Sequence, residues 1–344
     1  MRFVPNKFRG NYSFDPAMFF EFEELGIKTN GTLCISITDK GFVSKIKGKK
    51  FLLNLEEPNC LWAPNLRFPE GTFDRVFSIC KFTTIFMKRD QYNSGEYVFF
   101  PVNMKYVPES NERPFDLVYS GHLRHKKIIR ILQALKEKRL NLCVISDTDH
   151  SLVTHKGVNH MEKMKLIASS KLSLVYNQLF VTKMQRYLLE KDFPDYRNNL
   201  AFSHFKDQAL VNQEDSSLNL PIWLKLPLSI AEFLQEYSPI ERDLARYLEG
   251  LWSRSEVENA PQLKSRLFES TACGTIPVVI SDQWNLVGDW FSDEEYIPTS
   301  EESAVETICQ ALLKYNSLGS LVDHLKEKTR VNYSTIAFAD RYLS

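Results

Sequence analysis

Short runs of apolar, β-branched residues alternate along the chain with longer segments whose apolar residues recur at helical spacing. After residue 114 the predicted strands cover 115–119, 142–146, 171–177 and 275–280. The predicted helices between and around them cover 128–140, 160–167 and 263–272. Strands that alternate with helices build a parallel sheet covered by helices. The pattern therefore predicts an open α/β domain.

Residues 1 to about 110 show the same alternation on a smaller scale. Strands are predicted over 32–37, 50–55, 75–79 and 97–101, and helices over 19–25 and 82–89. The segment 108–114 is polar, contains two prolines and is the best candidate linker. We therefore expect a first α/β domain over 1–110 and a second one over 111–330.

The alternation is interrupted between about residues 178 and 260. The stretches Val181–Leu189 and Ile230–Leu251 have helical spacing, so we expect a helical insertion within the second domain. It could cover an active site, shape an acceptor pocket or mediate association. After it, the pattern predicts two helices and a final helix that ends near Leu343.

Charged residues gather where predicted strands end. Glu56 and Glu57 directly follow the strand 50–55, which places them at the carboxyl edge of a sheet, where open α/β folds carry out their chemistry. In the second domain the strand 115–119 leads into a basic loop that contains Gly121. Backbone amides and a helix amino end at such a loop favour an anion, although solvated loop charges would give the same pattern.

The helix predicted over 263–272 carries a further set of charges, namely Lys264, Arg266 and Glu269. Two cations and a carboxylate at a crevice suit a nucleoside diphosphate, with the cations on phosphate and the carboxylate on ribose hydroxyls. A solvated face of an amphipathic helix would look the same. Spacing alone leaves both interpretations open.

Composition narrows the classes of partner. Lys plus Arg and Asp plus Glu both number 43, so charge gives no case for nucleic acid or a membrane surface as the main partner. The six cysteines show no Cys-x-x-Cys spacing and indicate reduced core thiols. No segment approaches the roughly 20 apolar residues of a membrane span, and the start of the chain lacks the apolar core of a signal peptide. We expect a cytoplasmic protein without a transmembrane segment.

The run from Arg266 to Val279 places Glu269 before an Ala-Cys-Gly helix end and a Pro-Val-Val strand. This run resembles the donor-binding helix and following strand of GT-B glycosyltransferases. The resemblance implies two Rossmann-like domains with a cleft between them, and a C-terminal helix over 331–344 that crosses back to the first domain. It also implies that Glu269 holds the ribose of a nucleotide sugar. Retaining members carry a second glutamate eight residues upstream, where this chain has Pro261, so a retaining mechanism is not implied.

The resemblance covers roughly 115–177 and 262–342. In the family the loop that matches 121–127 often has glycine, arginine, leucine and a later lysine. Gly121 and Lys127 fit this pattern, whereas His122 replaces the arginine. The resemblance therefore assigns donor phosphate to Lys127, with Arg124 as its substitute, and implies that Val158 contacts the nucleotide base.

The stretch Leu55–Asn59 is also somewhat similar to the acceptor domain of α-1,3-fucosyltransferases, where a strand-end glutamate is the proposed base. This implies Glu57 as the general base of an inverting reaction, with Glu56 in reserve. Lys127, Lys264 and Arg266 would stabilise the departing diphosphate in place of a metal. No cofactor is then required.

Together these features predict a metal-independent glycosyltransferase that moves a sugar from a UDP- or GDP-linked donor to a glycan or another hydroxyl acceptor. Two alternatives stay open. Asp147 and Asp149 form an Asp-x-Asp after a strand, which is the metal-binding signature of GT-A glycosyltransferases. The chain could also be a nucleotide-sugar-binding module without transfer chemistry.

Overall fold

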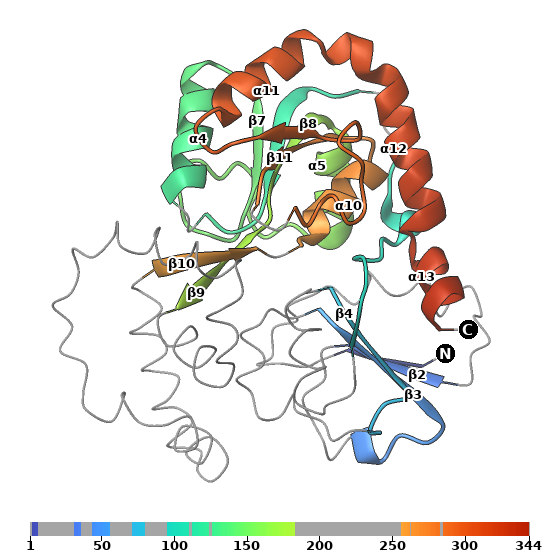
Figure 1. Cartoon of the computed structure of the whole chain (residues 1–344). Helices are drawn as coiled ribbons and strands as arrows, with labels where there is room; N and C mark the ends of the chain where they lie inside the picture. The colour runs from blue at the N-terminus through green and yellow to red at the C-terminus, as the bar shows by residue number, and fades with distance from the viewer. Residues whose placement is uncertain are drawn as a thin grey trace, which may run out of the picture.

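In the computed structural model two parallel β-sheets lie one above the other in the view of Figure 1. The structure describes residues 2–5, 31–35, 43–55, 71–79, 95–109, 112–123, 126–182, 256–261, 263–282 and 285–343. Each sheet belongs to one half of the predicted two-domain arrangement. Residues 98–109 and 112–114 lie in the connection between the two sheets.

Among the described residues, the first sheet contains five parallel strands in chain order. They are β1 (Arg2–Pro5), β2 (Gly31–Ile35), β3 (Lys49–Asn54), β4 (Arg75–Ser78) and β5 (Gly95–Tyr97). The strand predicted over 97–101 is misplaced, because the sheet pairing ends at Tyr97. The chain then leaves the sheet, and Val102 pairs instead with Ser334 near the C-terminus. That pairing partner is remote in sequence, so the local apolar run did not reveal it.

The second sheet holds β6 (Phe115–Ser120), β7 (Leu142–Ile145), β8 (Ser170–Tyr176), β11 (Ile276–Ile280) and β12 (Ile297–Thr299). Its strand order is β7-β6-β8-β11-β12, and all the pairings are parallel. The chain passes from β6 to one side for β7 and returns to the other side of β6 for β8. The boundary between β6 and β8 is therefore the topological switch point of a doubly wound sheet.

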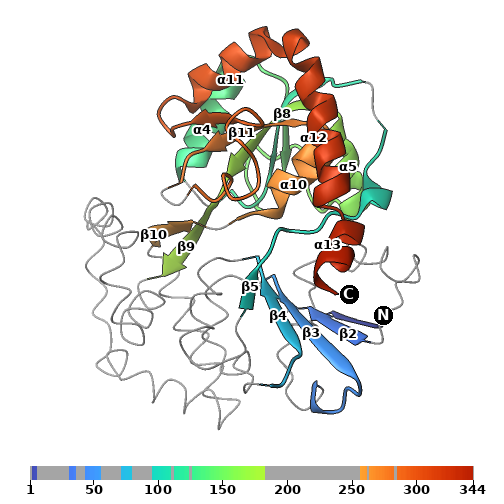
Figure 2. The same ribbon diagram turned by 45° about the vertical axis from the view of Figure 1, so that its right-hand side comes forward.

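Helices cover both faces of the second sheet (Figure 2). The helices α4 (Lys126–Glu137) and α11 (Ala304–Leu313) share one core with Leu172 and Leu174 of β8. The other face packs against α5 (His160–Ala168), α10 (Ser265–Ala272) and α12 (Gly319–Asn332). Within the described ranges no helix is both long and apolar enough to span a bilayer.

A two-stranded antiparallel ribbon leaves the second sheet at the boundaries of the interval 178–260 (Figure 1). It consists of β9 (Gln178–Thr182) and β10 (Glu256–Pro261). The helix predicted to start at Val181 is therefore wrong at its start, since Val181 pairs with Glu258. A β-branched residue next to a partner strand favours the ladder over a helix. The remainder of the expected insertion, residues 183–255, lies outside the described residues.

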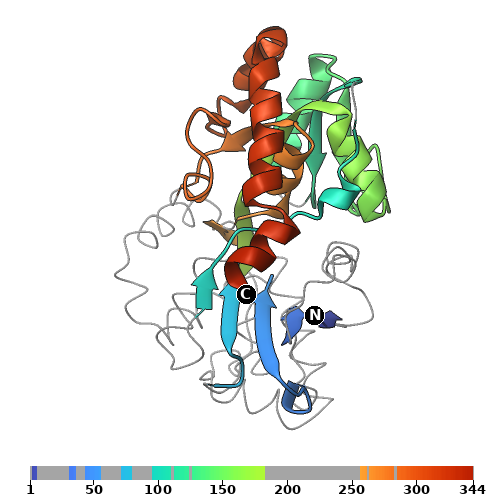
Figure 3. The ribbon, with the colours of Figure 1, turned by 90° about the vertical axis from the view of Figure 1, so that its right-hand side faces the viewer.

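The last helix, α13 (Thr335–Tyr342), lies on the first sheet, as predicted, whereas α12 belongs to the second unit (Figure 3). The rings of Phe338 and Tyr342 lie 5.6 Å and 5.5 Å from the ring of Phe77 in β4. Arg75 Nη1 also donates a hydrogen bond of 2.6 Å to the carbonyl oxygen of Tyr342. These contacts fix the end of the chain to the first unit.

Phe99 is the centre of the junction between the two units. It is fully buried and lies in the connection that follows β5. Its ring contacts five others, at centroid distances of 5.2 to 6.3 Å, in Phe268, Trp290, Tyr333, Phe338 and Tyr342. Since these rings belong to the second unit and to α13, both units share one continuous hydrophobic core.

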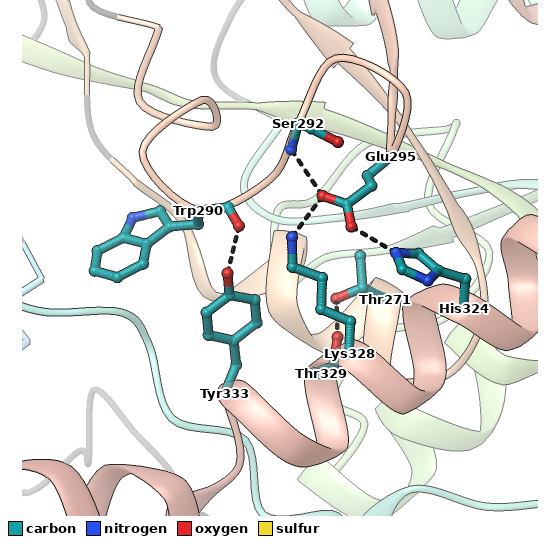
Figure 4. A network of polar contacts seen from close by, with 8 residues as sticks. All are labelled: Thr271, Trp290, Ser292, Glu295, His324, Lys328, Thr329 and Tyr333. Carbon is teal, nitrogen blue, oxygen red and sulfur yellow. Dashed lines mark hydrogen bonds and ion pairs between the residues drawn. The ribbon is translucent and has the colours of Figure 1, made fainter.

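A polar network joins α12 to the segment 290–295, which precedes β12 (Figure 4). The Glu295 carboxylate accepts hydrogen bonds from Lys328 Nζ at 2.5 Å and from the backbone N–H of Ser292 at 2.7 Å, and it pairs with His324 Nε2 at 2.6 Å. Burial acts to raise the pKa of Glu295, but these hydrogen bonds lower it to about 2. Next to this network, Tyr333 donates a hydrogen bond to the carbonyl oxygen of Trp290.

Removing the Phe99 ring tests the junction. We expect Phe99→Ala to lower the free energy of unfolding by about 3–5 kcal/mol, because it leaves a cavity among five aromatic rings. Urea denaturation measures this loss. Leu313→Ala, at a side chain that is 80% exposed, is the control and should change stability by no more than about 0.5 kcal/mol. Equal effects of the two substitutions would show that the ring cluster does not hold the units together.

Candidate functional site

The candidate site lies at the carboxyl ends of β6 and β8, on either side of the switch point. Strand β6 ends at Ser120 and leads into Gly121, while β8 ends at Tyr176 and leads into Asn177. In open α/β sheets, ligands bind outside the carboxyl ends of the strands at this point. The topology therefore selects the same loop that the sequence pattern selected.

Arg266 of α10 lies directly against Gly121. The backbone of Gly121 has φ 153°, a region that side-chain-bearing residues rarely adopt. A Cβ atom there would be only 2.5 Å from Arg266 Nη2. The guanidinium carbon of Arg266 also lies 5.2 Å from the centroid of the Tyr119 ring in β6, a cation–π contact. Glycine thus leaves the space that the guanidinium group occupies.

The start of α10 is tied to the end of β8. The backbone N–H of Lys264 donates a hydrogen bond of 3.2 Å to Asn177 Oδ1, and no side chain caps the helix that follows. The first amides of a helix have no partner within it, and the helix dipole makes this end positive. The α10 start therefore presents an anion-binding end to the switch point.

Glu269 is buried one turn further along α10, with an exposed fraction of 2%. Its Oε1 atom accepts a hydrogen bond of 2.6 Å from Lys163 Nζ of α5. Burial acts to raise the pKa of this carboxyl group, but the surrounding cations, foremost Lys163, outweigh it and lower the pKa below its ordinary value. Glu269 is therefore an ionised acceptor at neutral pH.

Lys163 is a site residue that the sequence interpretation did not include. It lies 106 residues before Glu269, and only the packing of α5 against α10 brings the two together. The α5 start itself was predicted correctly, with the Asn159 side chain accepting a hydrogen bond of 2.9 Å from the backbone N–H of Glu162. Nothing in the local spacing of α5 marks Lys163 as a partner for a carboxylate.

The other predicted donor-site residues lie in different surroundings. Lys127, in the first turn of α4, forms an ion pair with Glu301, which also accepts a hydrogen bond of 3.0 Å from the Tyr176 hydroxyl. Val158 is partly buried and packs against the core beside α5. Arg124, and both carboxylates of the predicted catalytic pair (Glu56 and Glu57), lie outside the described residues.

The two aspartates of the predicted metal motif have other partners. Asp147 Oδ1 accepts a hydrogen bond of 3.3 Å from the backbone N–H of Gly157. Asp149 is fully exposed and pairs with Lys156 at 3.4 Å. In the part of the chain that the structure describes, no group of three or more His, Cys, Asp or Glu side chains could hold a metal ion.

Comparison with known proteins identifies the fold. No protein-family model and no curated protein sequence matches the chain. Among solved structures, HepE of Anabaena in complex with UDP and glucose matches 94% of this chain and 79% of its own, with a TM-score of 0.50 and 8% identity. A mutant of S. aureus TarM in complex with Fondaparinux, α-GlcNAc-glycerol and UDP matches 91% of this chain but only 54% of its own, with a TM-score of 0.49 and 9% identity.

The fold is GT-B, as predicted from the sequence, with two separate parallel sheets and a C-terminal helix on the first. The GT-A fold, the first alternative raised by Asp147 and Asp149, is not the fold of this chain. The likeness to HepE at 8% identity establishes the architecture.

Breaking the buried ion pair tests the geometry of the site. Lys163→Met leaves the Glu269 carboxylate buried without its counter-charge, so we expect a loss of about 3–5 kcal/mol in the free energy of unfolding at neutral pH. In the wild type the lowered pKa stabilises the fold above the unfolded pKa of about 4.3, and this contribution is lost as the pH falls through the folded pKa. Burial then raises the pKa in the variant, so its deficit should shrink as the pH falls towards about 4.3.

Urea denaturation across pH 4–8 measures both effects. Lys165→Met, at an exposed lysine of the same helix, is the matched control and should stay within about 0.5 kcal/mol of the wild type. Adding Glu269→Gln to Lys163→Met should recover part of the loss, because no charge is then left unpaired. A Lys163→Met protein as stable as the Lys165→Met protein would contradict the pairing.

Proposed function

We propose that this protein is a glycosyltransferase that moves a sugar from a UDP- or GDP-linked donor to the hydroxyl of a glycan or another acceptor. The observation that carries the proposal is the position of Arg266 against Gly121 at the switch point of a GT-B fold, with the uncapped α10 start beside it and the Glu269 carboxylate one turn further along the same helix. Cationic and amide donors match a diphosphate, and the carboxylate matches ribose hydroxyls. HepE, which shares the fold, was determined with UDP and glucose, which supports this class of ligand.

Arg266 is proposed as the main diphosphate ligand. The family pattern has an arginine after the loop glycine, and this chain has His122 there. The guanidinium group of Arg266 reaches the same glycine from α10 and rests on Tyr119, so it is held in place before the ligand arrives. Its planar set of donors can bind two phosphate oxygens and stabilise the charge that develops on the leaving diphosphate. We therefore propose a reaction that needs no metal ion.

Glu269 is proposed as the ribose ligand. A carboxylate offers about four acceptor positions on its two oxygens, and Lys163 uses one of them on Oε1. The remaining positions can accept both hydroxyls of a ribose. Lys163 contributes by keeping the carboxylate ionised and in one orientation, which makes it a positioning residue.

Glu57 is proposed as the general base that deprotonates the acceptor, with Glu56 in reserve. Strand β3 ends at Asn54, so both glutamates follow the carboxyl end of a strand in the first sheet. The two proposed halves of the reaction are then divided between the units. The second unit holds the donor, and the first supplies the base.

Donor binding is the first test. We expect one or more UDP- or GDP-sugars to stabilise the wild type by about 2.7 kcal/mol at a concentration 100 times the dissociation constant. Arg266→Gln should weaken binding about 10- to 100-fold, because it removes a charge-assisted contact to phosphate. Calorimetric titration measures the affinities, and Arg130→Gln at an exposed arginine of α4 is the control.

A comparison with Lys127→Gln decides which cation binds phosphate. Lys127 already forms an ion pair with Glu301. We therefore expect Lys127→Gln to weaken donor binding less than Arg266→Gln does. If no nucleotide sugar of a broad panel stabilises or binds the wild type, the proposed function is wrong.

Transfer itself is tested with Glu57→Gln. The variant should bind the donor with wild-type affinity and transfer sugar at less than about 1% of the wild-type rate, because a general base contributes about 10²–10⁴-fold. The assay follows donor consumption by protein dialysed against a chelator, since the proposed reaction needs no metal. Unchanged turnover would remove Glu57 from the mechanism. Donor binding by the wild type without any turnover would leave a binding module.

A further inference from the structure

Asn177 has an unused hydrogen-bond donor in a fully buried position. Its side chain has an exposed fraction of 0%, and it follows β8 at the switch point. Its Oδ1 atom accepts the backbone N–H of Lys264, which fixes the orientation of the carboxamide. Within the described part of the chain, Nδ2 has no hydrogen-bond partner. Buried polar groups are nearly always hydrogen-bonded. The expected partner of Asn177 Nδ2 is therefore an acceptor atom of a bound ligand.

The surroundings of Asn177 define the chemistry of that partner. The bond to Lys264 places the carboxamide at the amino end of α10, and β8 lies next to β6, which leads to Gly121 and the Arg266 guanidinium. The helix amides, the guanidinium group and Nδ2 are all donors. A ligand shared by these groups must present several acceptor oxygens and negative charge.

We propose that Asn177 binds the diphosphate of the nucleotide sugar, with Nδ2 donating a hydrogen bond to one of its oxygens. This inference rests on the proposed function and adds a residue to its binding site. Asn177 combines two tasks in one carboxamide. The oxygen positions the α10 start, and the nitrogen contacts the ligand that the α10 start also binds.

This assignment explains why the position holds asparagine and not aspartate. An aspartate could still accept the Lys264 N–H, and its charge would suit the positive end of a helix. It would, however, lack the donor and place a negative charge against the diphosphate. Asn177→Asp therefore separates the structural task of the residue from its task in binding.

The experiment compares nucleoside diphosphates with nucleosides by calorimetric titration. The probes are UDP and GDP, with uridine and guanosine as their counterparts without phosphate. We expect Asn177→Asp to weaken binding of the diphosphate at least about 10-fold while nucleoside binding stays unchanged. Asn177→Ala should also weaken diphosphate binding, by about 10-fold, because it removes the donor without adding charge.

Ser173→Ala is the matched control. Ser173 is buried on the same strand, and its Oγ accepts a hydrogen bond of 2.8 Å from Ser270 Oγ of α10, so its loss disturbs the same helix contact away from the switch point. Ser173→Ala should lower the melting temperature without changing the affinity for the diphosphate.

The role proposed for Asn177 would be overturned if either folded Asn177 variant bound the diphosphate with wild-type affinity. It would also be overturned if a variant lost equal affinity for the nucleoside and for the diphosphate. Neither result would affect the proposed function. A wild type that binds neither UDP nor GDP would overturn the proposed function together with this inference.

Discussion

The parallel pairing of β6 with β8 is the constraint on which the candidate site depends. These strands are neighbours in the sheet although β7 lies between them in the chain, so the connections after β6 and β8 depart in different directions. Space then remains at the carboxyl end of the pair. Gly121, Asn177 and the start of α10 border this space, and its donors are Asn177 Nδ2 and the first amides of α10. The winding of the sheet therefore determines where an anion can bind.

Charge pairing inside the site decides which groups face a ligand. Arg266 and Glu269 are three residues apart on α10, a spacing at which opposite charges usually pair along a helix. Here Glu269 forms its ion pair with Lys163 of α5, and the guanidinium group of Arg266 lies over Tyr119 beside Gly121. Because Lys163 supplies the counter-charge of the buried carboxylate, Arg266 can lie at the switch point. Lys163 thus supports both halves of the proposed donor site.

The sequence predicted those features that local pattern determines. The periodicity predicted the alternation of strands and helices, and the resemblance of the run around Glu269 to GT-B glycosyltransferases implied the GT-B fold. The features it missed depend on contacts between remote segments. Lys163 meets Glu269 only through helix packing, Asn177 shows an unpaired amide only once α10 is placed, and Val181 is in a strand because β10 returns beside it. Spacing along one element carries no information on such partners.

Helix α10 belongs to the candidate donor site and to the junction between the units at the same time. Its first turn carries Arg266. Further along the helix, the ring of Phe268 lies 6.3 Å from the ring of Phe99, centroid to centroid, and Thr271 Oγ1 accepts a hydrogen bond of 2.8 Å from Thr329 Oγ1 of α12. A close-packed core transmits a shift of one element to its neighbours. The position of the first unit, which would supply the base, is therefore fixed against the same helix that would hold the donor. A donor that moves the start of α10 acts directly on the core that both units share.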